Sequence, residues 1–466
     1  MPPSALSPKR SLEDPAEEQT RPHAPPKHAP TISSVDTRPI AIPQRSLDTL
    51  YSESSILKIW QVAQKALGSV DPPLLYPEYT NKDKTYVYRS LDFWTSGFFP
   101  GSLYLLLERQ IQYPAFYPYS RRWETPGPLP HRLQLQHLCR WWSANLHQNA
   151  ARHDTHDLGF MVAPWAIKAW ELHRDPQAYS SLVLAAHSLA SRFDPRRYSF
   201  TNPAKDFLVV IDNMLNLDLL FWTQIHRIRP DKSTIHVVNY NADGTPKAKF
   251  THQGYSDGSC WSRGQSWGIL GFMQTYGWTR DVSFLQTARD LADYFIEHLP
   301  DDAVPYWDFN APVDESFPRD TSAGMIASCG LVLLYKALKS SNDRFEAEAA
   351  AYYLDSALRI LEGTVSKFMT SSPGKFDVAQ VASDLPTFPV NEPARQPGLL
   401  TISAKEGLSG SALQFPETIL DAATVCNYEF ASRRWADHGL VYADYYFLLL
   451  GNMLLELGVV NRDRSL

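Results

Sequence analysis

Apolar residues recur at the spacing of amphipathic helices in successive segments from Ser54 to residue 457. In the first segment Ile56, Ile59 and Trp60 share one helical face, and the serines before them can cap a helix. Strand patterns are few and short, as in IHVVNY after Thr234. The pattern predicts helices at residues 54–67, 95–110, 130–149, 158–172, 176–192, 208–226, 264–277, 283–298, 321–338, 343–367, 410–425 and 440–457.

Helices that follow one another in pairs without a domain-breaking linker predict one all-α domain. Its expected architecture is a closed ring of helical hairpins, an (α/α)6 barrel, with polar and aromatic residues at the starts of the inner helices. One pairing is incomplete, because only RPDKST separates LDLLFWTQIHRI from the strand-like IHVVNY. We therefore expect either a barrel that lacks one helix after residue 226 or a chain that has lost a segment at this point. A helical solenoid is the other all-α option, but no fixed repeat is present.

Composition limits the classes of partner. Residues 1–50 are rich in proline, charge and small polar residues, which predicts a disordered tail before a barrel domain at 51–466. The net charge of −6, without a basic patch, argues against a nucleic-acid partner. Four scattered cysteines without a CxxC pair, no apolar signal segment and no run of bilayer-spanning length predict a soluble cytoplasmic protein with no membrane contact.

Two acidic positions precede predicted helices. Asp157 lies in HDTHDLGF, where helix capping explains a single acid but not the whole cluster. Asp212 lies between VVI and Asn-Met-Leu, where apolar surroundings would raise the pKa of its carboxyl toward that of a general acid. A capped helix start explains Asp212 equally well. His153 and His156 are three residues apart, but no further ligand cluster accompanies them, so we expect no metal.

A third polar cluster, HQGYSDGSCWSRGQSW at 252–267, mixes small residues with planar polar and aromatic side chains. Such a mixture suits a sugar, which offers CH faces for stacking and hydroxyls for hydrogen bonds. Arg263 is expected to clamp a carboxylate through its bidentate guanidinium, with a structural salt bridge as the alternative. Core packing is the alternative for Trp267. Because the chain has no GxSxG elbow, P-loop or HExxH, the aspartates and this cluster indicate carbohydrate chemistry by carboxylates.

The chain resembles glycoside hydrolase family 88, the unsaturated glucuronyl hydrolases, in segments that follow in order through most of residues 51–466. The most specific is HQGYSDGSCWSRGQSWG at 252–268. The others are HDLGF (156–160), IDNMLNL (211–217), STIHVVNYNADG (233–244), PRDTSAGMIASCGL (318–331) and ADHGLVYADYYF (436–447).

The resemblance implies an (α/α)6 barrel and a hydrolase without metal or cofactor, whose substrates are unsaturated uronic-acid oligosaccharides left by polysaccharide lyases. By the family mechanism, Asp212 protonates C4 of the vinyl ether and activates a water that adds at C5, while Asp157 holds ring hydroxyls. The implied substrate-binding positions are His236, Gln253, Trp261, Arg263 and Trp267.

Two other functions stay open at this point. One is the related unsaturated rhamnogalacturonyl hydrolase, and the other is a catalytically inactive sugar-binding barrel, which the lacking helix favours and the intact aspartates disfavour. The family's stacking aromatic upstream of Asp212 is not a tryptophan here, and Phe200 is the candidate replacement. The loop ADHG departs from the family pattern, so the resemblance implies no preference for the adjoining sugar.

Overall fold

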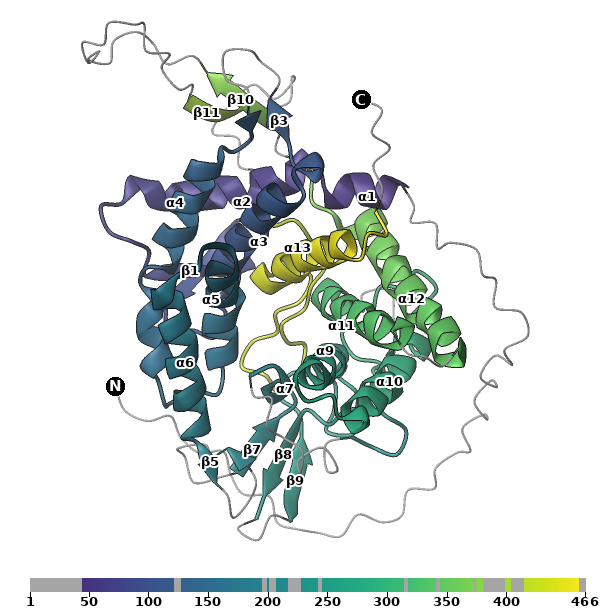
Figure 1. Ribbon diagram of the computed structural model, residues 1–466. Coiled ribbons are helices and arrows are strands. Elements are labelled where there is room, and N and C mark those ends of the chain that lie inside the picture. The colour runs from purple at the N-terminus through teal and green to yellow at the C-terminus, as the bar shows by residue number, and fades with distance from the viewer. Residues whose placement is uncertain are drawn as a thin grey trace, which may run out of the picture. The chain divides into compact units, whose positions relative to one another are not determined.

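Helices follow one another around a closed ring in the computed structural model of this protein (Figure 1). Each inner helix contacts the next one in the chain, and the last contacts the first. These inner helices are α3 (Phe98–Gln112), α5 (Leu158–His173), α7 (Asn213–Asn216), α9 (Ser262–Thr279), α11 (Thr321–Lys339) and α13 (Val441–Glu456). The structure describes residues 44–120, 127–194, 199–200, 207–216, 228–241, 245–313, 317–340, 344–372, 374–379, 399–403 and 415–460.

A second layer of helices covers the ring from outside. Helices α4 (Arg132–Ser143), α6 (Pro176–Ala190), α10 (Val282–Glu297) and α12 (Arg344–Phe368) pack on α3, α5, α9 and α11. At the N-terminal end, α1 (Gln44–Leu50) contacts α12 and α13, and α2 (Glu53–Lys65) contacts α3 and α4. Short 3-10 helices lie at Ala66–Gly68, Pro114–Phe116 and Leu146–Ala151. This is the predicted (α/α)6 plan, in which the N-terminal helices complete the outer layer beside the last inner helix.

The hairpin that begins with α7 is incomplete in the described residues. Helix α7 has a single turn, residues 217–227 lie outside the description, and Ile228 already bridges Thr234 on the way into strand β8 (Val237–Tyr240). No outer helix lies within residues 228–241, as predicted.

Two predicted helices differ from the structure: one is confirmed only over α7 (Asn213–Asn216), and the other is wrong in the residues that the structure describes. The helix expected over 208–226 begins instead with strand β7 (Phe207–Val210), because its β-branched valines pair with Val237 and Val238 of β8. The helix expected at 410–425 is absent from residues 415–425, which form isolated bridges at Leu420 and Ala423. Tertiary pairing overrides local helical pattern in both segments.

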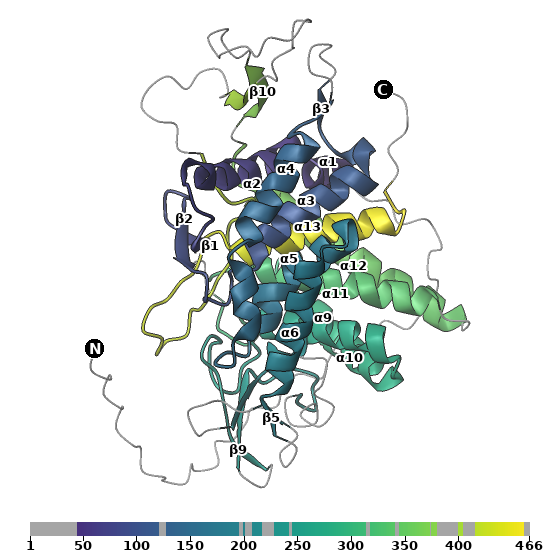
Figure 2. The same ribbon diagram turned by 60° about the vertical axis from the view of Figure 1, so that its left-hand side comes forward.

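The strands form small antiparallel sheets between the helices. Strand β1 (Leu75–Thr80) pairs with β2 (Tyr86–Ser90), and β8 pairs with both β7 and β9 (Pro246–Phe250). Strand β10 (Lys375–Ala379) pairs with β11 (Leu399–Ser403), and β10 lies beside α2 in both Figure 1 and Figure 2. Two-residue pairs are β3 (Tyr119–Ser120) with β4 (Gly127–Pro128) and β5 (Phe193–Asp194) with β6 (Ser199–Phe200).

The folded part begins before the predicted boundary at residue 50. Helix α1 belongs to the segment that we expected to be a disordered tail, yet Leu47 and Leu50 are buried. Burial of these leucines against the barrel offsets the entropy of ordering the helix. Residues 1–43 of the predicted tail lie outside the described residues.

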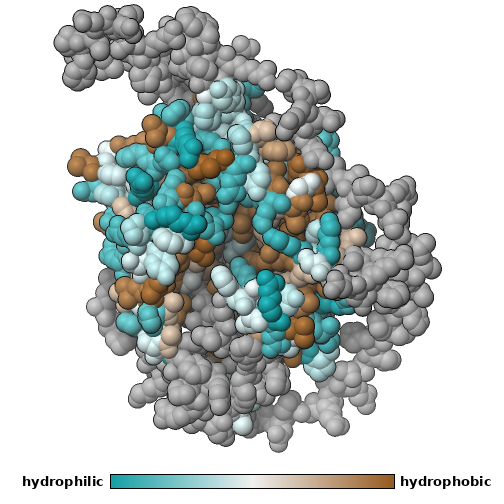
Figure 3. All heavy atoms as spheres, in the orientation of Figure 1, coloured by the Kyte–Doolittle hydropathy of each residue, from teal (hydrophilic) through white to brown (hydrophobic). Residues whose placement is uncertain are grey.

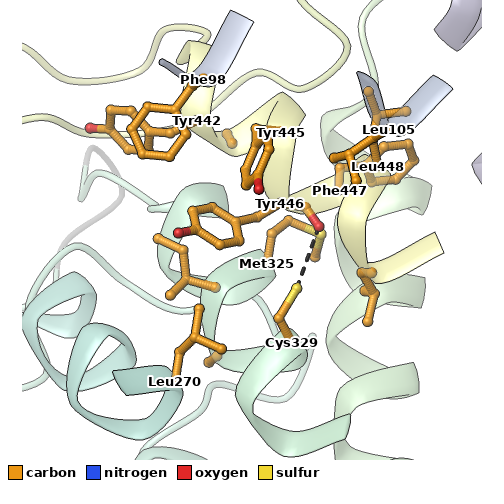
Figure 4. Packing of buried hydrophobic residues seen from close by; sticks show 14 of the residues in the cluster. Phe98, Leu105, Leu270, Met325, Cys329, Tyr442, Tyr445, Tyr446, Phe447 and Leu448 are labelled. Carbon is orange, nitrogen blue, oxygen red and sulfur yellow. Dashed lines mark hydrogen bonds between the residues drawn. The ribbon is translucent and has the colours of Figure 1, made fainter. Parts of the chain in front are cut away.

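Inner helices are apolar nearly all round because both of their faces are covered. Figure 4 shows Tyr445, Phe447 and Leu448 of α13 packed among Leu105 of α3 and Met325 of α11. Helix α11 is long and apolar enough by length and composition to cross a membrane, the only such helix in the described part, but 83% of this stretch is buried inside the protein. The surface in Figure 3, by contrast, mixes hydrophilic residues with interspersed apolar ones.

Helices α3 and α5 approach so closely that a side chain is excluded at Gly97. A Cβ at this position would lie 2.2 Å from the carbonyl oxygen of Phe160 and 2.7 Å from that of Met161. We expect Gly97→Ala to lower the free energy of unfolding by at least about 1–3 kcal/mol, because the backbone of α5 must move. Urea unfolding measures the change. The control Gly277→Ala, in α9 with nothing within 4 Å, should be neutral or slightly stabilising.

Candidate active site

The first turns of the inner helices meet at one end of the ring. Asp157 directly precedes α5, Asp212 precedes α7, and Trp261 and Asp320 occupy the N-cap positions of α9 and α11. Ring contacts join these turns, since Trp267 of α9 packs 5.1 Å from Phe160 of α5. The candidate residues, separated widely along the chain, therefore share one neighbourhood.

Asp212 is held in place by the small sheet. After β7 pairs with β8, the amide of Ile211 donates to the carbonyl of His236 at 3.0 Å. Burial, and then the nearby charge of Asp157, raise the pKa of Asp212 to about 6, against the opposing effects of His156 and Arg263. A carboxyl with a pKa of about 6 is half protonated at pH 6 and partly protonated just below neutral pH, so it can act as a general acid.

Asp157 occupies the N-cap position of α5 but does not cap the helix with its side chain. Its side chain makes no capping bond to α5, so the alternative explanation from the sequence does not hold. Thr155 Oγ1 donates to Asp157 Oδ2 at 3.3 Å, and His156 Nε2 lies 3.4 Å from Oδ1. The negative charge of Asp157 contributes to the raised pKa of Asp212, which places the two acids close enough to act on the same ligand.

The other members of the HDTHD cluster face different groups. Asp154 pairs with Arg152 at 2.6 Å on the surface, and His153 Nδ1 lies 3.1 Å from Ser191 Oγ. No group of three or more metal-ligating side chains occurs among the residues that the structure describes.

His236 is a neutral hydrogen-bond donor of fixed orientation. Its Nδ1 accepts the amide of His252 at 3.2 Å and lies 3.0 Å from Thr251 Oγ1, so the proton resides on Nε2. Burial, with the neighbouring His252 and Arg263, lowers the pKa of His236 to about 3. Its ring packs 4.5 Å from the ring of Trp261.

Arg263 is committed to protein partners. Its Nη1 donates to Asp320 Oδ2 at 2.8 Å and to the carbonyl of Thr424, and its Nη2 donates to the carbonyl of Val425 at 2.7 Å. The side chain is 1% exposed and the carboxylate of Asp320 is 0% exposed. The expected bidentate clamp on a ligand carboxylate does not fit this geometry, because the guanidinium already holds a buried carboxylate. The structural salt bridge, the alternative from the sequence, is what the structure has.

Trp267 and Gln253 both make contacts with other parts of the protein. Trp267 is 1% exposed and packs against Phe160 and Tyr446, so it belongs to the core, as its alternative explanation proposed. Gln253 Nε2 donates to the carbonyl of Val425 at 2.9 Å, which ties the 252–267 segment to the chain before α13. Direct contact of either residue with a ligand stays a prediction. Phe200 lies in β6, but its side chain is outside the described part.

Sequence reasoning missed several residues that line the same neighbourhood. Trp94 and Phe98 contact Phe160, and Tyr442 contacts Trp94 and Phe98. The aromatic-rich segment DFWTSGFF, which leads into the first turn of α3, was a usable signal for Trp94 and Phe98. Tyr442 lies in the segment ADHGLVYADYYF but was not singled out there, because an aromatic residue in an apolar inner helix is usually a core residue.

The chain is similar in sequence to curated hydrolases, although no family model matches it. Over 302 residues it is 32% identical to an unsaturated glucuronyl hydrolase from Formosa agariphila, covering 59% of this chain and 70% of that protein. An unsaturated chondroitin disaccharide hydrolase from Streptococcus pyogenes serotype M1 is 29% identical over 310 residues, covering 61% of this chain and 73% of that protein.

Solved structures share the fold. An unsaturated glucuronyl hydrolase specific for heparin has a TM-score of 0.65 at 23% identity, covering 89% of this chain and 98% of that chain. The unsaturated glucuronyl hydrolase from Bacillus sp. GL1 has a TM-score of 0.64 at 22% identity, covering 89% of this chain and 97% of that chain.

The raised pKa of Asp212 has a consequence for stability. A carboxyl whose pKa rises from 3.8 to about 6 on folding makes the folded state bind more protons, so stability falls as pH rises through this window. The substitution Asp212→Asn removes this titrating carboxyl and with it the loss of stability at higher pH. We therefore expect the variant to have a free energy of unfolding about 1–3 kcal/mol higher than wild type at pH 7.5, but not at pH 3.5. Urea unfolding at both pH values tests this. A matched change at the exposed Asp301 should show no such difference between the two pH values, and an equal effect there would contradict the explanation.

Proposed function

Because the chain belongs to the unsaturated glucuronyl hydrolases of glycoside hydrolase family 88, we propose that it removes the non-reducing 4,5-unsaturated glucuronic acid from lyase-generated oligosaccharides. The main observation that supports this function is the raised pKa of Asp212, about 6, near Asp157. Both residues lie directly before inner helices. We propose Asp212 as the catalytic acid and base, and Asp157 as its partner.

The reaction is a hydration of the vinyl ether C4=C5–O5. Protonated Asp212 gives its proton to C4, and positive charge develops over C5 and O5. The resulting carboxylate takes a proton from water as the hydroxyl adds to C5, which restores Asp212 and leaves a hemiketal. The C5–O5 bond then breaks to a ketone, and collapse at C1 to an aldehyde releases the neighbouring sugar.

These reaction steps need one group that acts first as an acid and afterwards as a base. A pKa near the working pH suits both roles, and burial of Asp212 supplies it. Because no nucleophile attacks the anomeric carbon, the separation of the two carboxyls carries no information on retention or inversion.

The surrounding groups suit a uronate in this reaction. Asp157 offers carboxylate oxygens to ring hydroxyls, and His236 offers a fixed Nε2–H donor. The indole N–H of Trp261 is buried without a hydrogen-bond partner in the described residues, which suits a ligand acceptor. Arg263 contributes its positive charge from within its pair with Asp320.

Single substitutions distinguish the role of Asp212 from that of Asp157. We expect Asp212→Asn to abolish the loss of double-bond ultraviolet absorbance from an unsaturated disaccharide, and Asp157→Asn to slow it by about 10²–10⁴-fold. Calorimetry should show that the disaccharide still binds to Asp212→Asn. The control is Asp154→Asn, in the same cluster but paired with Arg152 at the surface, which should keep near wild-type rates. An active Asp212→Asn variant would remove this residue from the mechanism.

The pH dependence follows from the same carboxyl. Since C4 receives its proton from Asp212, kcat/KM should fall above about pH 6 with the loss of a single proton. Initial rates between pH 4.5 and 8.5, taken from the absorbance change, measure this falling limb of the pH–rate profile.

A second variant tests the cause of that limb. Asp320→Asn keeps an N-cap for α11 but leaves the charge of Arg263 uncompensated. The free positive charge lowers the pKa of Asp212, so the limb should move to lower pH. A limb that stays in place would show that another group controls it.

The identity of the adjoining sugar is a separate question for a substrate panel. Unsaturated glycosaminoglycan disaccharides and pectic disaccharides, compared side by side, distinguish the proposed enzyme from an unsaturated rhamnogalacturonyl hydrolase. Binding without turnover of any panel member would instead indicate a sugar-binding barrel and would overturn the proposal.

A further inference from the structure

Tyr442 carries a buried hydroxyl that the protein itself does not satisfy. The residue lies in the first turn of α13, is 0% exposed, and packs its ring 5.1 Å from Trp94 and 5.7 Å from Phe98. Its hydroxyl has no hydrogen-bond partner among the described residues. Buried polar groups are nearly always paired, and an unpaired one is destabilising, so this hydroxyl requires an explanation.

The hydroxyl lies at the reacting end of the site. The guanidinium carbon of Arg263 is 5.5 Å from the Tyr442 ring, and the charges that act on the hydroxyl include Asp320 and Asp212. Figure 4 shows the hydroxyl oxygen of Tyr442 pointing away from Phe447 and Leu448 of the same helix. The carboxylates whose charges act on this oxygen are those of Asp320, Glu78 and Asp212.

The group is a hydrogen-bond donor at every working pH. Burial raises the pKa of Tyr442 far above its ordinary value, so the phenol keeps its proton. The nearby positive charge of Arg263 favours an anion as the acceptor. The uronate substrate carries one such anion, the carboxylate on C5.

The carboxylate of the substrate needs hydrogen-bond donors other than Arg263. Its guanidinium is occupied by Asp320 and two backbone carbonyls. Two aromatic donors contact the same guanidinium: the Trp261 ring at 4.6 Å and the Tyr442 ring at 5.5 Å. Both donor atoms are buried and unpaired in the described part of the chain.

Resting on the function proposed above, we propose that the Tyr442 hydroxyl binds the C5 carboxylate of the unsaturated uronate. Tyr442 is thus a substrate-binding residue that selects for the acid, beside the buried Arg263–Asp320 pair. The carboxylate supplies the partner that the hydroxyl lacks within the protein.

The first test is Tyr442→Phe, which removes one oxygen. We expect kcat/KM on the unsaturated disaccharide to fall about 10- to 100-fold, as for loss of a charge-assisted hydrogen bond. The melting temperature should stay the same or rise, because no protein hydrogen bond is lost. A structural role would instead lower the melting temperature and leave kcat/KM within about twofold of wild type.

Tyr445→Phe is the matched control. Tyr445 lies on the same helix and its ring also packs on Phe98, at 5.3 Å, but the carboxylates acting on its hydroxyl are Glu108 and Glu171. It should keep wild-type kcat/KM. An equal fall in both variants would overturn the proposal.

The second test identifies the acceptor without turnover. In the Asp212→Asn background, calorimetry compares binding of the unsaturated disaccharide and its uronate methyl ester, with and without Tyr442→Phe. We expect affinity for the acid to fall about 10- to 100-fold and affinity for the ester to change less than about twofold. Equal losses for acid and ester would overturn the carboxylate assignment.

The outcomes keep the two proposals distinct. An active wild-type protein with an unimpaired Tyr442→Phe variant overturns the role of Tyr442 alone. A wild-type protein inactive on every unsaturated disaccharide overturns the proposed function, and the Tyr442 assignment falls with it.

Discussion

The buried ion pair between Arg263 and Asp320 is the interaction on which the site depends. One carboxylate oxygen of Asp320 caps α11 through the amides of Ser322 and Ala323, and the other accepts from Arg263 at the start of α9. The same guanidinium holds the carbonyls of Thr424 and Val425, in the segment that leads to α13. A buried charge is tolerated only when its hydrogen bonds are complete, so three parts of the chain must assemble together around it.

This pair also explains how an acid with a raised pKa survives beside an arginine. The charge of Arg263 lowers the pKa of Asp212, and the buried carboxylate of Asp320 opposes that charge. Burial and Asp157 then prevail, and the pKa of Asp212 stays at about 6. The positive charge remains close enough to favour an anionic substrate, while hydrogen bonding to that anion is left to neutral donors.

In the inner helices, the residues that form the core and the polar residues of the site lie in different parts of the helix. The bodies of α11 and α13 are apolar nearly all round and form the core, whereas their first turns carry the polar groups. The incomplete hairpin after α7 is the exception, because Asp212 there depends on a strand. Pairing of β7 with β8, and the hydrogen bond from the amide of Ile211 to the carbonyl of His236, position Asp212 where residues 228–241 form no outer helix.

The sequence by itself predicted the alternation of inner and outer helices, the absence of an outer helix from the described residues 228–241, and the positions of Asp157 and Asp212 at helix starts. These features are local: periodicity reports which face is buried, and polar clusters at helix starts stand out against it. Only the tertiary structure decided that 207–210 is a strand, that Arg263 is paired and Trp267 buried, and that the Tyr442 hydroxyl is unsatisfied. Each of these depends on partners distant in the chain, 57 residues for Arg263 and Asp320 and 162 for Arg263 and Val425, and local patterns carry no record of such partners.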